Sequence, residues 1–194
     1  MDFELKKLTR SLICSEKTDA LIVLIPDGMT PGDDPLSTLA ELALKCGDLE
    51  AKPGKLLSAY RSEGIAAPRV LLAGVGDASP KNIRAAVNAA LSGLKTSNAQ
   101  RVVVCLSAIE KLPPAAVRAA VVACSETVYA YSTTKSKPAP VKLQRVLVAV
   151  NDLTSAQPAF DKAIGLVKGI ELAKEWANRP ANHATPTLLA GAAK

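Results

Sequence analysis

The chain has 194 residues, of which 48% are hydrophobic and 22% charged, a balance typical of a folded core rather than a disordered chain. Aromatic residues make up only 3%, which excludes a nucleic-acid module that stacks bases on aromatic platforms. The net charge of +6 is uneven, because residues 51–150 carry 14 Lys and Arg against 4 Asp and Glu, while residues 1–50 carry 5 against 10. This basic middle block is either a surface for phosphate or acidic partners or a merely solvated surface.

Nothing in the sequence predicts a membrane segment or an export signal. The apolar run at residues 20–25 is far shorter than the ~20 residues that span a bilayer, and the first ten residues alternate charged and apolar side chains, unlike a signal peptide. The four cysteines are widely spaced and form no CxxC pair, as expected for free thiols in a reducing compartment. We therefore expect a soluble cytoplasmic protein with no membrane partner.

Short apolar runs along the chain predict the strands of a sheet. Four runs are rich in β-branched residues and apolar at successive positions, as in strands that helices cover on both faces. They are residues 20–25, 70–75, 102–106 and 146–150. Two amphipathic stretches, residues 3–5 and 128–131, are expected to add edge strands.

Helical patterns separate these runs. Apolar residues recur at helical spacing within residues 36–44, 83–94 and 116–121. Ser79 and Pro80 supply an N-cap and a first-turn proline for the second helix. The polar, basic residues 132–140 are expected to form an exposed loop. The alternation predicts an α/β fold with a mixed, mostly parallel sheet and helices on both faces.

A long helix is expected after the last strand. Ser155 is a candidate cap, and the helix is expected to begin near Pro158 and to run to about Ala177. One apolar stripe follows it: Ala163, Leu166, Ile170, Ala173 and Ala177. Pro180 prevents its continuation, and Thr185 with Pro186 predicts the start of a further helix.

The residues themselves offer no catalytic constellation. His183 is the single histidine, with no HExxH motif and no Cys/His cluster at zinc spacing, and we expect it at the surface. Asp33 and Asp34 lie in a Pro-Gly loop and are interpreted as solvated turn residues. Gly74 and Gly76 fit either a phosphate loop or a tight strand-to-helix turn, and the missing third glycine favours the turn.

Residues 173–190, AKEWANRPANHATPTLLA, resemble the motif that precedes the catalytic domain of leucyl (cytosol) aminopeptidases, peptidase family M17. The matching positions are Ala173, Asn178, Pro180, Asn182, Thr185, Pro186, Leu189 and Ala190. Lys174 and Trp176 depart from that pattern conservatively. Upstream, residues 69–76 (RVLLAGVG) and 82–86 (NIRAA) resemble the strand-turn-helix of the family's N-terminal domain.

The resemblance implies the N-terminal domain of an enzyme that releases N-terminal residues, leucine favoured, from peptides. It implies two divalent ions, Mn or Zn, that would lower the pKa of a bridging water. Their lysine and carboxylate ligands lie in family motifs that this sequence lacks, so we expect no catalytic residue, metal site or cofactor in this chain. The implied partners are peptide substrates, the enzyme's own catalytic domain and the other subunits of a homo-hexamer.

On this basis we divide the chain in two. Residues 1–154 are expected to form an N-terminal α/β domain, and residues 155–194 the connecting helix and the start of a C-terminal catalytic domain whose remainder the sequence does not contain.

Two other functions stay open at this point. Some bacterial relatives also bind DNA, which agrees with the basic middle block, and the candidate phosphate contacts are then Lys135, Lys137, Lys142 and Arg145. A solvated basic loop is the alternative interpretation of these four residues. The third possibility is a free-standing ligand-binding domain that uses the turn at residues 74–77, but its long helix would have no partner for the apolar stripe.

Overall fold

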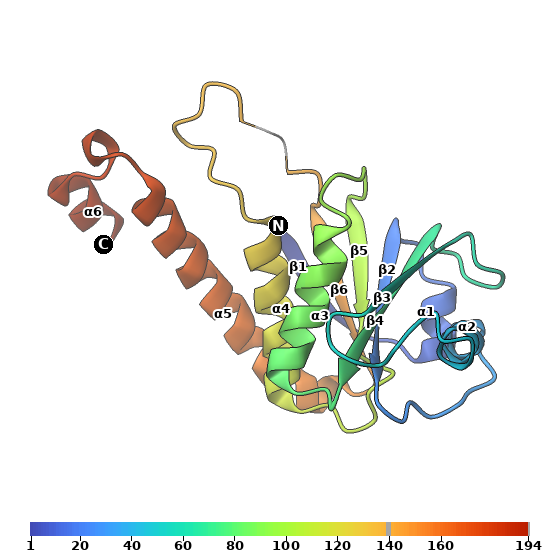
Figure 1. Cartoon of the computed structure of the whole chain (residues 1–194). Coiled ribbons are helices and arrows are strands. Elements are labelled where there is room, and N and C mark those ends of the chain that lie inside the picture. Colours follow the sequence, from blue (N-terminus) through green and yellow to red (C-terminus); the bar gives the residue numbers. More distant parts are fainter. Residues whose placement is uncertain (139–140, 194) are drawn as a thin grey trace.

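The computed structural model describes residues 1–138 and 141–193, and its centre is one six-stranded sheet (Figure 1). The strands are β1 (Asp2–Lys7), β2 (Ala20–Pro26), β3 (Leu56–Tyr60), β4 (Arg69–Gly76), β5 (Arg101–Cys105) and β6 (Arg145–Val150). Their order is β1-β6-β5-β2-β4-β3, and every neighbouring pair is parallel except β3 with β4. The expected mixed, mostly parallel sheet is confirmed.

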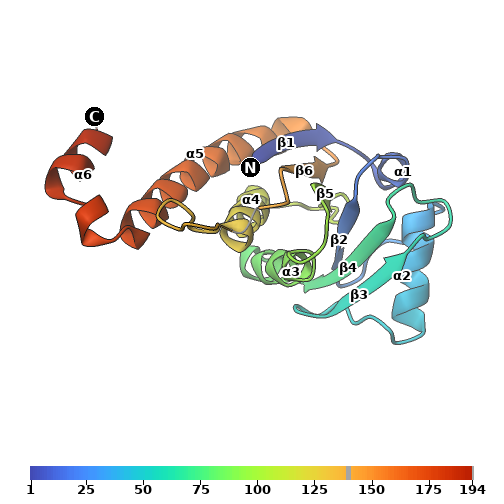
Figure 2. The same cartoon turned by 90° about the horizontal axis from the view of Figure 1, so that it is seen from above.

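Helices cover both faces of this sheet (Figure 2). They are α1 (Arg10–Cys14), α2 (Pro35–Lys45), α3 (Pro80–Ser92), α4 (Pro114–Val128), α5 (Leu153–Asn178) and α6 (Pro186–Ala192). Helices α1 and α2 pack on one face, and α3, α4 and the first half of α5 pack on the other. No helix within the described residues combines the length and apolarity needed to cross a membrane.

Strand β2 shows why the sheet is buried on both sides. Its side chains alternate between the faces, so Ile22 and Leu24 join the core under α3–α5 while Leu21 and Val23 join the core under α1 and α2. All four are at most 1% exposed. The strand must therefore be apolar at successive positions, because a polar side chain on either face would be buried without a hydrogen-bond partner.

The edge strands of the sheet agree only partly with the sequence prediction. The strand expected at residues 3–5 is confirmed as β1, but the one expected at 128–131 is wrong. Helix α4 continues to Val128, and the Tyr129 N–H still donates to the carbonyl of Ser125 at 2.9 Å. The antiparallel edge is instead β3, whose LLSAY sequence has only partial burial and therefore a weak apolar signal. The five-residue α1 was also missed.

Helix α5 begins earlier than expected and packs through a different stripe. Its cap is Asp152, whose carboxylate accepts the Thr154 N–H at 3.0 Å, rather than Ser155. The buried positions are Ala156, Phe160, Ala163 and Val167. Only Ala163 of the predicted stripe is among them, since Leu166 is 45% exposed and Ala173 and Ala177 are exposed as well.

The second half of α5 leaves the domain and carries α6 away from the sheet (Figures 1 and 2). The helix ends at Asn178, one residue after its expected end at about Ala177, and Thr185 caps α6 through the Leu188 N–H at 3.4 Å. Residues 132–138 form the expected exposed loop, and residues 139 and 140 of that prediction lie outside the described residues.

Candidate functional site

The described part of the chain contains no group of three or more His, Cys, Asp and Glu side chains placed to hold a metal ion. His183 lies exposed in a short 3-10 helix (Ala181–His183). The described residues therefore offer no ligand set for the two metal ions that the sequence resemblance implies for the whole enzyme.

Three of the four cysteines are not activated nucleophiles. All four are free, and burial raises the pKa of the Cys105 thiol to about 11 and that of Cys124 to about 12. Burial also raises the pKa of Cys14. These three thiols stay protonated at neutral pH, whereas a nucleophilic cysteine needs its thiolate form.

The turn between β4 and α3 has a structural role that accounts for its glycines. A Cβ on Gly74 would lie 2.4 Å from the carbonyl oxygen of Lys52, and Gly76 has a φ of +56°. The Asp77 carboxylate accepts the Ser79 N–H at 2.9 Å and the Asn82 side-chain amide at 2.7 Å. The Ser79 hydrogen bond lowers the pKa of Asp77. This carboxylate occupies the N–H group that a phosphate would need, so the geometry favours the tight-turn interpretation.

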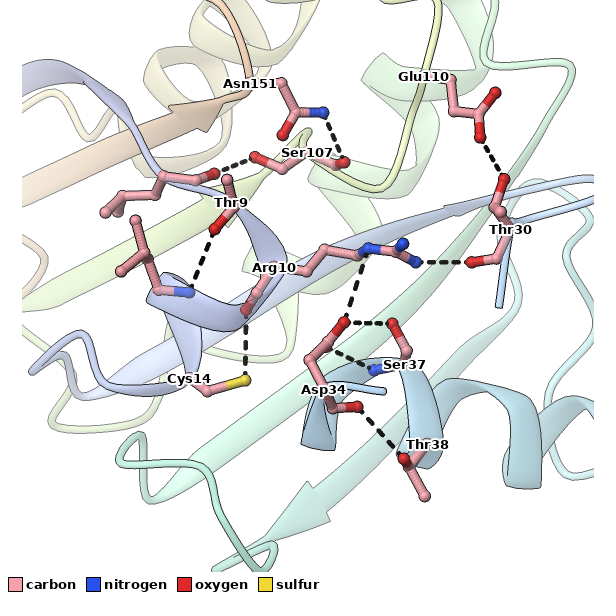
Figure 3. A network of polar contacts seen from close by, with 12 residues as sticks. Thr9, Arg10, Cys14, Thr30, Asp34, Ser37, Thr38, Ser107, Glu110 and Asn151 are labelled. Atoms are coloured by element: carbon pink, nitrogen blue, oxygen red, sulfur yellow. Dashed lines mark hydrogen bonds and ion pairs between the residues drawn. The ribbon is translucent and has the colours of Figure 1, made fainter. Parts of the chain in front are cut away.

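Figure 3 shows a polar network at the carboxyl ends of the parallel strands. It borders a groove of about 650 Å³, lined by segments that follow β1, β2, β5 and β6. Arg10 Nη1 donates to the carbonyl of Thr30 at 2.7 Å, and Arg10 Nε lies 3.8 Å from the Asp34 carboxylate. Asp34 also accepts the Ser37 N–H at 2.9 Å, which caps α2. The prediction that Asp34 is solvated is thus wrong, since its side chain is 8% exposed.

This groove lies at a switch point of the fold. Neighbouring strands β2 and β5 lead to α2 on one face and α4 on the other, and open α/β sheets bind ligands at such crevices. Here, however, the polar groups satisfy one another. Ser107 Oγ donates to the Leu8 carbonyl at 2.5 Å, and the Asn151 amide donates to the Ser107 carbonyl at 2.9 Å. The network ties strand ends together.

The four predicted phosphate contacts lie near the opposite, amino-end edge of the sheet, and all four are exposed. Lys135 and Lys137 lie on the loop after α4, Lys142 Nζ donates to Asn98 Oδ1 at 2.8 Å, and Arg145 begins β6.

Sequence reasoning missed two basic residues that belong with this group. Arg101 begins β5 and is directly opposite Arg145 in the sheet register. Lys95 follows α3 and lines the same cavity as Lys142. The signal available in the sequence was an arginine at the start of three strand runs, Arg69, Arg101 and Arg145.

The outer half of α5 is held by polar contacts with the end of α4. Ser125 Oγ donates to Glu171 at 2.8 Å, and Thr133 donates to Glu175. Lys174 Nζ lies 5.1 Å above the Tyr129 ring. Large apolar side chains of α5 and α6 also face solvent. They are Leu172 (52% exposed), Leu188 (50%) and Leu189 (51%).

Solved structures of other proteins have a fold similar to that of this chain. A variant of tomato leucine aminopeptidase is similar over 100% of this chain and 41% of its own, with a TM-score of 0.75 and 20% sequence identity. A bottromycin maturation enzyme in complex with Mn is similar over 90% of this chain and 35% of its own, with a TM-score of 0.66 and 22% identity. At these identities the likeness establishes the fold alone.

Sequence relatives cover the whole chain. A probable cytosol aminopeptidase of Polaromonas naphthalenivorans is 73% identical over 195 residues, and one of a further Polaromonas strain is 72% identical. The chain spans 38% of the length of each of these relatives. The model of the N-terminal domain of the cytosol aminopeptidase family matches residues 29–138. The chain therefore belongs to the cytosol aminopeptidase family and contains that family's N-terminal domain.

Proposed function

We propose that this chain is the non-catalytic N-terminal domain of an aminopeptidase that releases N-terminal residues, leucine favoured, from peptides in the cytoplasm. The observation that carries the proposal is the family match over residues 29–138 in a chain that spans 38% of its named relatives. The proposed boundary follows residue 154, close to the Asp152 cap of α5.

The two divalent ions, Mn or Zn, would then be held by other parts of the protein. In this proposal α5 is the connection to the catalytic domain. Its exposed outer half and the leucines of α6 would contact that domain in a homo-hexamer, since apolar side chains grouped at a surface favour a protein partner.

Hydrolysis of leucine p-nitroanilide with added Mn²⁺ tests the proposal. We expect no metal-dependent turnover above buffer from the purified 194-residue chain, because its described residues provide no ligand set for a metal-activated water. A full-length protein of this family measured under the same conditions is the positive control. Metal-dependent turnover by the chain alone, retained through a second purification step, would contradict the proposal.

DNA binding is a second candidate function, favoured by the amino-end edge of the sheet. Arg101 and Arg145 are neighbours there, and Lys95 and Lys142 line one cavity beside them. No ion pair among the described residues engages these four side chains. Four unpaired cations at one edge of a sheet suit the regularly spaced phosphates of a duplex.

The salt dependence of duplex binding tests this candidate. If Lys95, Arg101, Lys142 and Arg145 contact phosphates, the slope of log K against log salt is about −3 to −4, and Lys142→Glu with Arg145→Glu makes this slope shallower by about 2. The control is Lys81→Glu with Lys111→Glu, which makes the same charge change near the carboxyl-end edge. Equal losses in both double variants, or no binding at low salt, would reject the candidate.

A further inference from the structure

A cavity of about 260 Å³ lies on the α3–α4 side of the sheet, beside the amino-end edge. The ends of α3 and α4, the start of β5 and the segment before β6 form its walls. The apolar lining residues are Leu91, Leu94, Ala99, Val102, Val128, Ala130, Val141 and Leu143, and the Tyr129 ring completes the wall. Val141 is 46% exposed at this site, so part of the apolar lining is open to solvent.

Both charged residues that line this cavity, Lys95 and Lys142, are basic, and none of the described residues that line it is acidic. Asp2, Glu171 and Glu175 line an adjoining pocket that shares Val128 and Val141 with it. The carbonyl ends of α3 and α4 add about half a negative charge each, so the two ammonium groups outweigh them. The nearest recorded partner of Lys142 is the neutral amide of Asn98, at 2.8 Å, which leaves its positive charge uncompensated.

We propose that this cavity binds a small carboxylate with an apolar body, which enters between α3, α4 and residues 141–143 and pairs its carboxylate with Lys95 and Lys142. The volume holds about nine non-hydrogen atoms, at the ~30 Å³ that a water molecule occupies in the liquid. A medium-chain fatty acid has this size. The apolar walls provide affinity through burial, and the two lysines select the charge of the ligand.

The same charges exclude free amino acids of similar size. An α-amino group beside the carboxylate would bring a third ammonium next to Lys95 and Lys142, where like charges repel. The cavity should therefore bind a carboxylate without an amino group and not an amino acid that a peptidase would release. This binding depends only on the cavity and its lysines, and not on the proposed peptidase role.

Titration calorimetry of the 194-residue chain with matched eight-carbon probes tests the inference. We expect octanoate to bind at one site, and we expect both 2-aminooctanoate and octylamine to bind at least tenfold more weakly. Acetate, which has the charge without the apolar body, should give no measurable heat. Equal binding of octanoate and octylamine, or no binding of octanoate, would overturn the proposal.

Substitutions at the cavity test whether octanoate binds there. Lys95→Met and Lys142→Met together should weaken octanoate binding about tenfold or more, while Lys135→Met with Lys137→Met, on the neighbouring loop, should leave it unchanged. Ala99→Phe fills the cavity from the segment before β5 and should abolish binding, with urea unfolding used to check that this variant folds. The lysine pair is exposed, so it tests the proposal even where Ala99→Phe fails to fold. Unchanged binding in the Lys95 and Lys142 double variant would overturn it.

Discussion

Replacing Gly74 by alanine is expected to lower the free energy of unfolding by about 3 kcal/mol, because the new methyl group has no space. Its Cβ would lie 2.4 Å from the carbonyl oxygen of Lys52 and 2.6 Å from that of Glu50, both backbone atoms. Two hydrogen bonds hold this segment against β4, from Gly74 N–H to Lys55 at 3.0 Å and from Gly76 N–H to Ala51 at 2.6 Å. Relief of the clash would break at least one of them.

Urea unfolding followed by circular dichroism measures this effect. Gly165→Ala is the matched control, because Gly165 lies within α5 with nothing within 4 Å of an added Cβ. That variant should be as stable as the parent chain or more stable by up to about 1 kcal/mol, since alanine favours a helix over glycine. A Gly74→Ala variant within 0.5 kcal/mol of the parent would show that the segment at residues 50–55 is not held as described.

Phe160→Ala is expected to cost about 3 kcal/mol of unfolding free energy, as large-to-small changes of buried aromatic residues do. Phe160 is 7% exposed and is the largest of the buried side chains that α5 contributes to the core, beside Ala156, Ala163 and Val167. Its truncation leaves a cavity between α5 and the sheet that small neighbouring residues cannot fill. The first half of α5 should therefore lose much of its attachment.

Leu166→Ala is the control for this prediction and separates two interpretations of the helix. The stripe inferred from the sequence makes Leu166 a core residue, whereas the structure leaves it 45% exposed. We expect a change within 0.5 kcal/mol for Leu166→Ala in the same urea experiment. If Leu166→Ala lowered the unfolding free energy as much as Phe160→Ala, the stripe predicted from the sequence would be the buried one, in place of the observed stripe.

The long helix shows how far periodicity alone can predict packing. A stripe through residues 163–177 and one through residues 156–167 both satisfy helical spacing. The packing of α5 against the sheet and α4 determines that the stripe through residues 156–167 is the buried one. The helix leaves the domain after Val167, so later residues do not contact the core. Edge strand β3 was missed for a related reason, since a strand with one solvated face needs few apolar residues.

The sequence by itself determined the central strands, the starts of α3 and α6, and the family. Strands buried on both faces must be apolar throughout, and caps and prolines act within a few residues, so these features are local and visible in the chain. The motif at residues 173–190 is local in the same sense.

The tertiary structure alone decided which distant residues meet. The pairing of Arg101 with Arg145 depends on strand register, the cavity of Lys95 and Lys142 depends on how two helices end against the sheet, and the burial of Asp34 depends on Arg10 in another element. These contacts form between segments far apart in the chain, and their positions follow from packing in three dimensions rather than from the spacing of residues along the sequence.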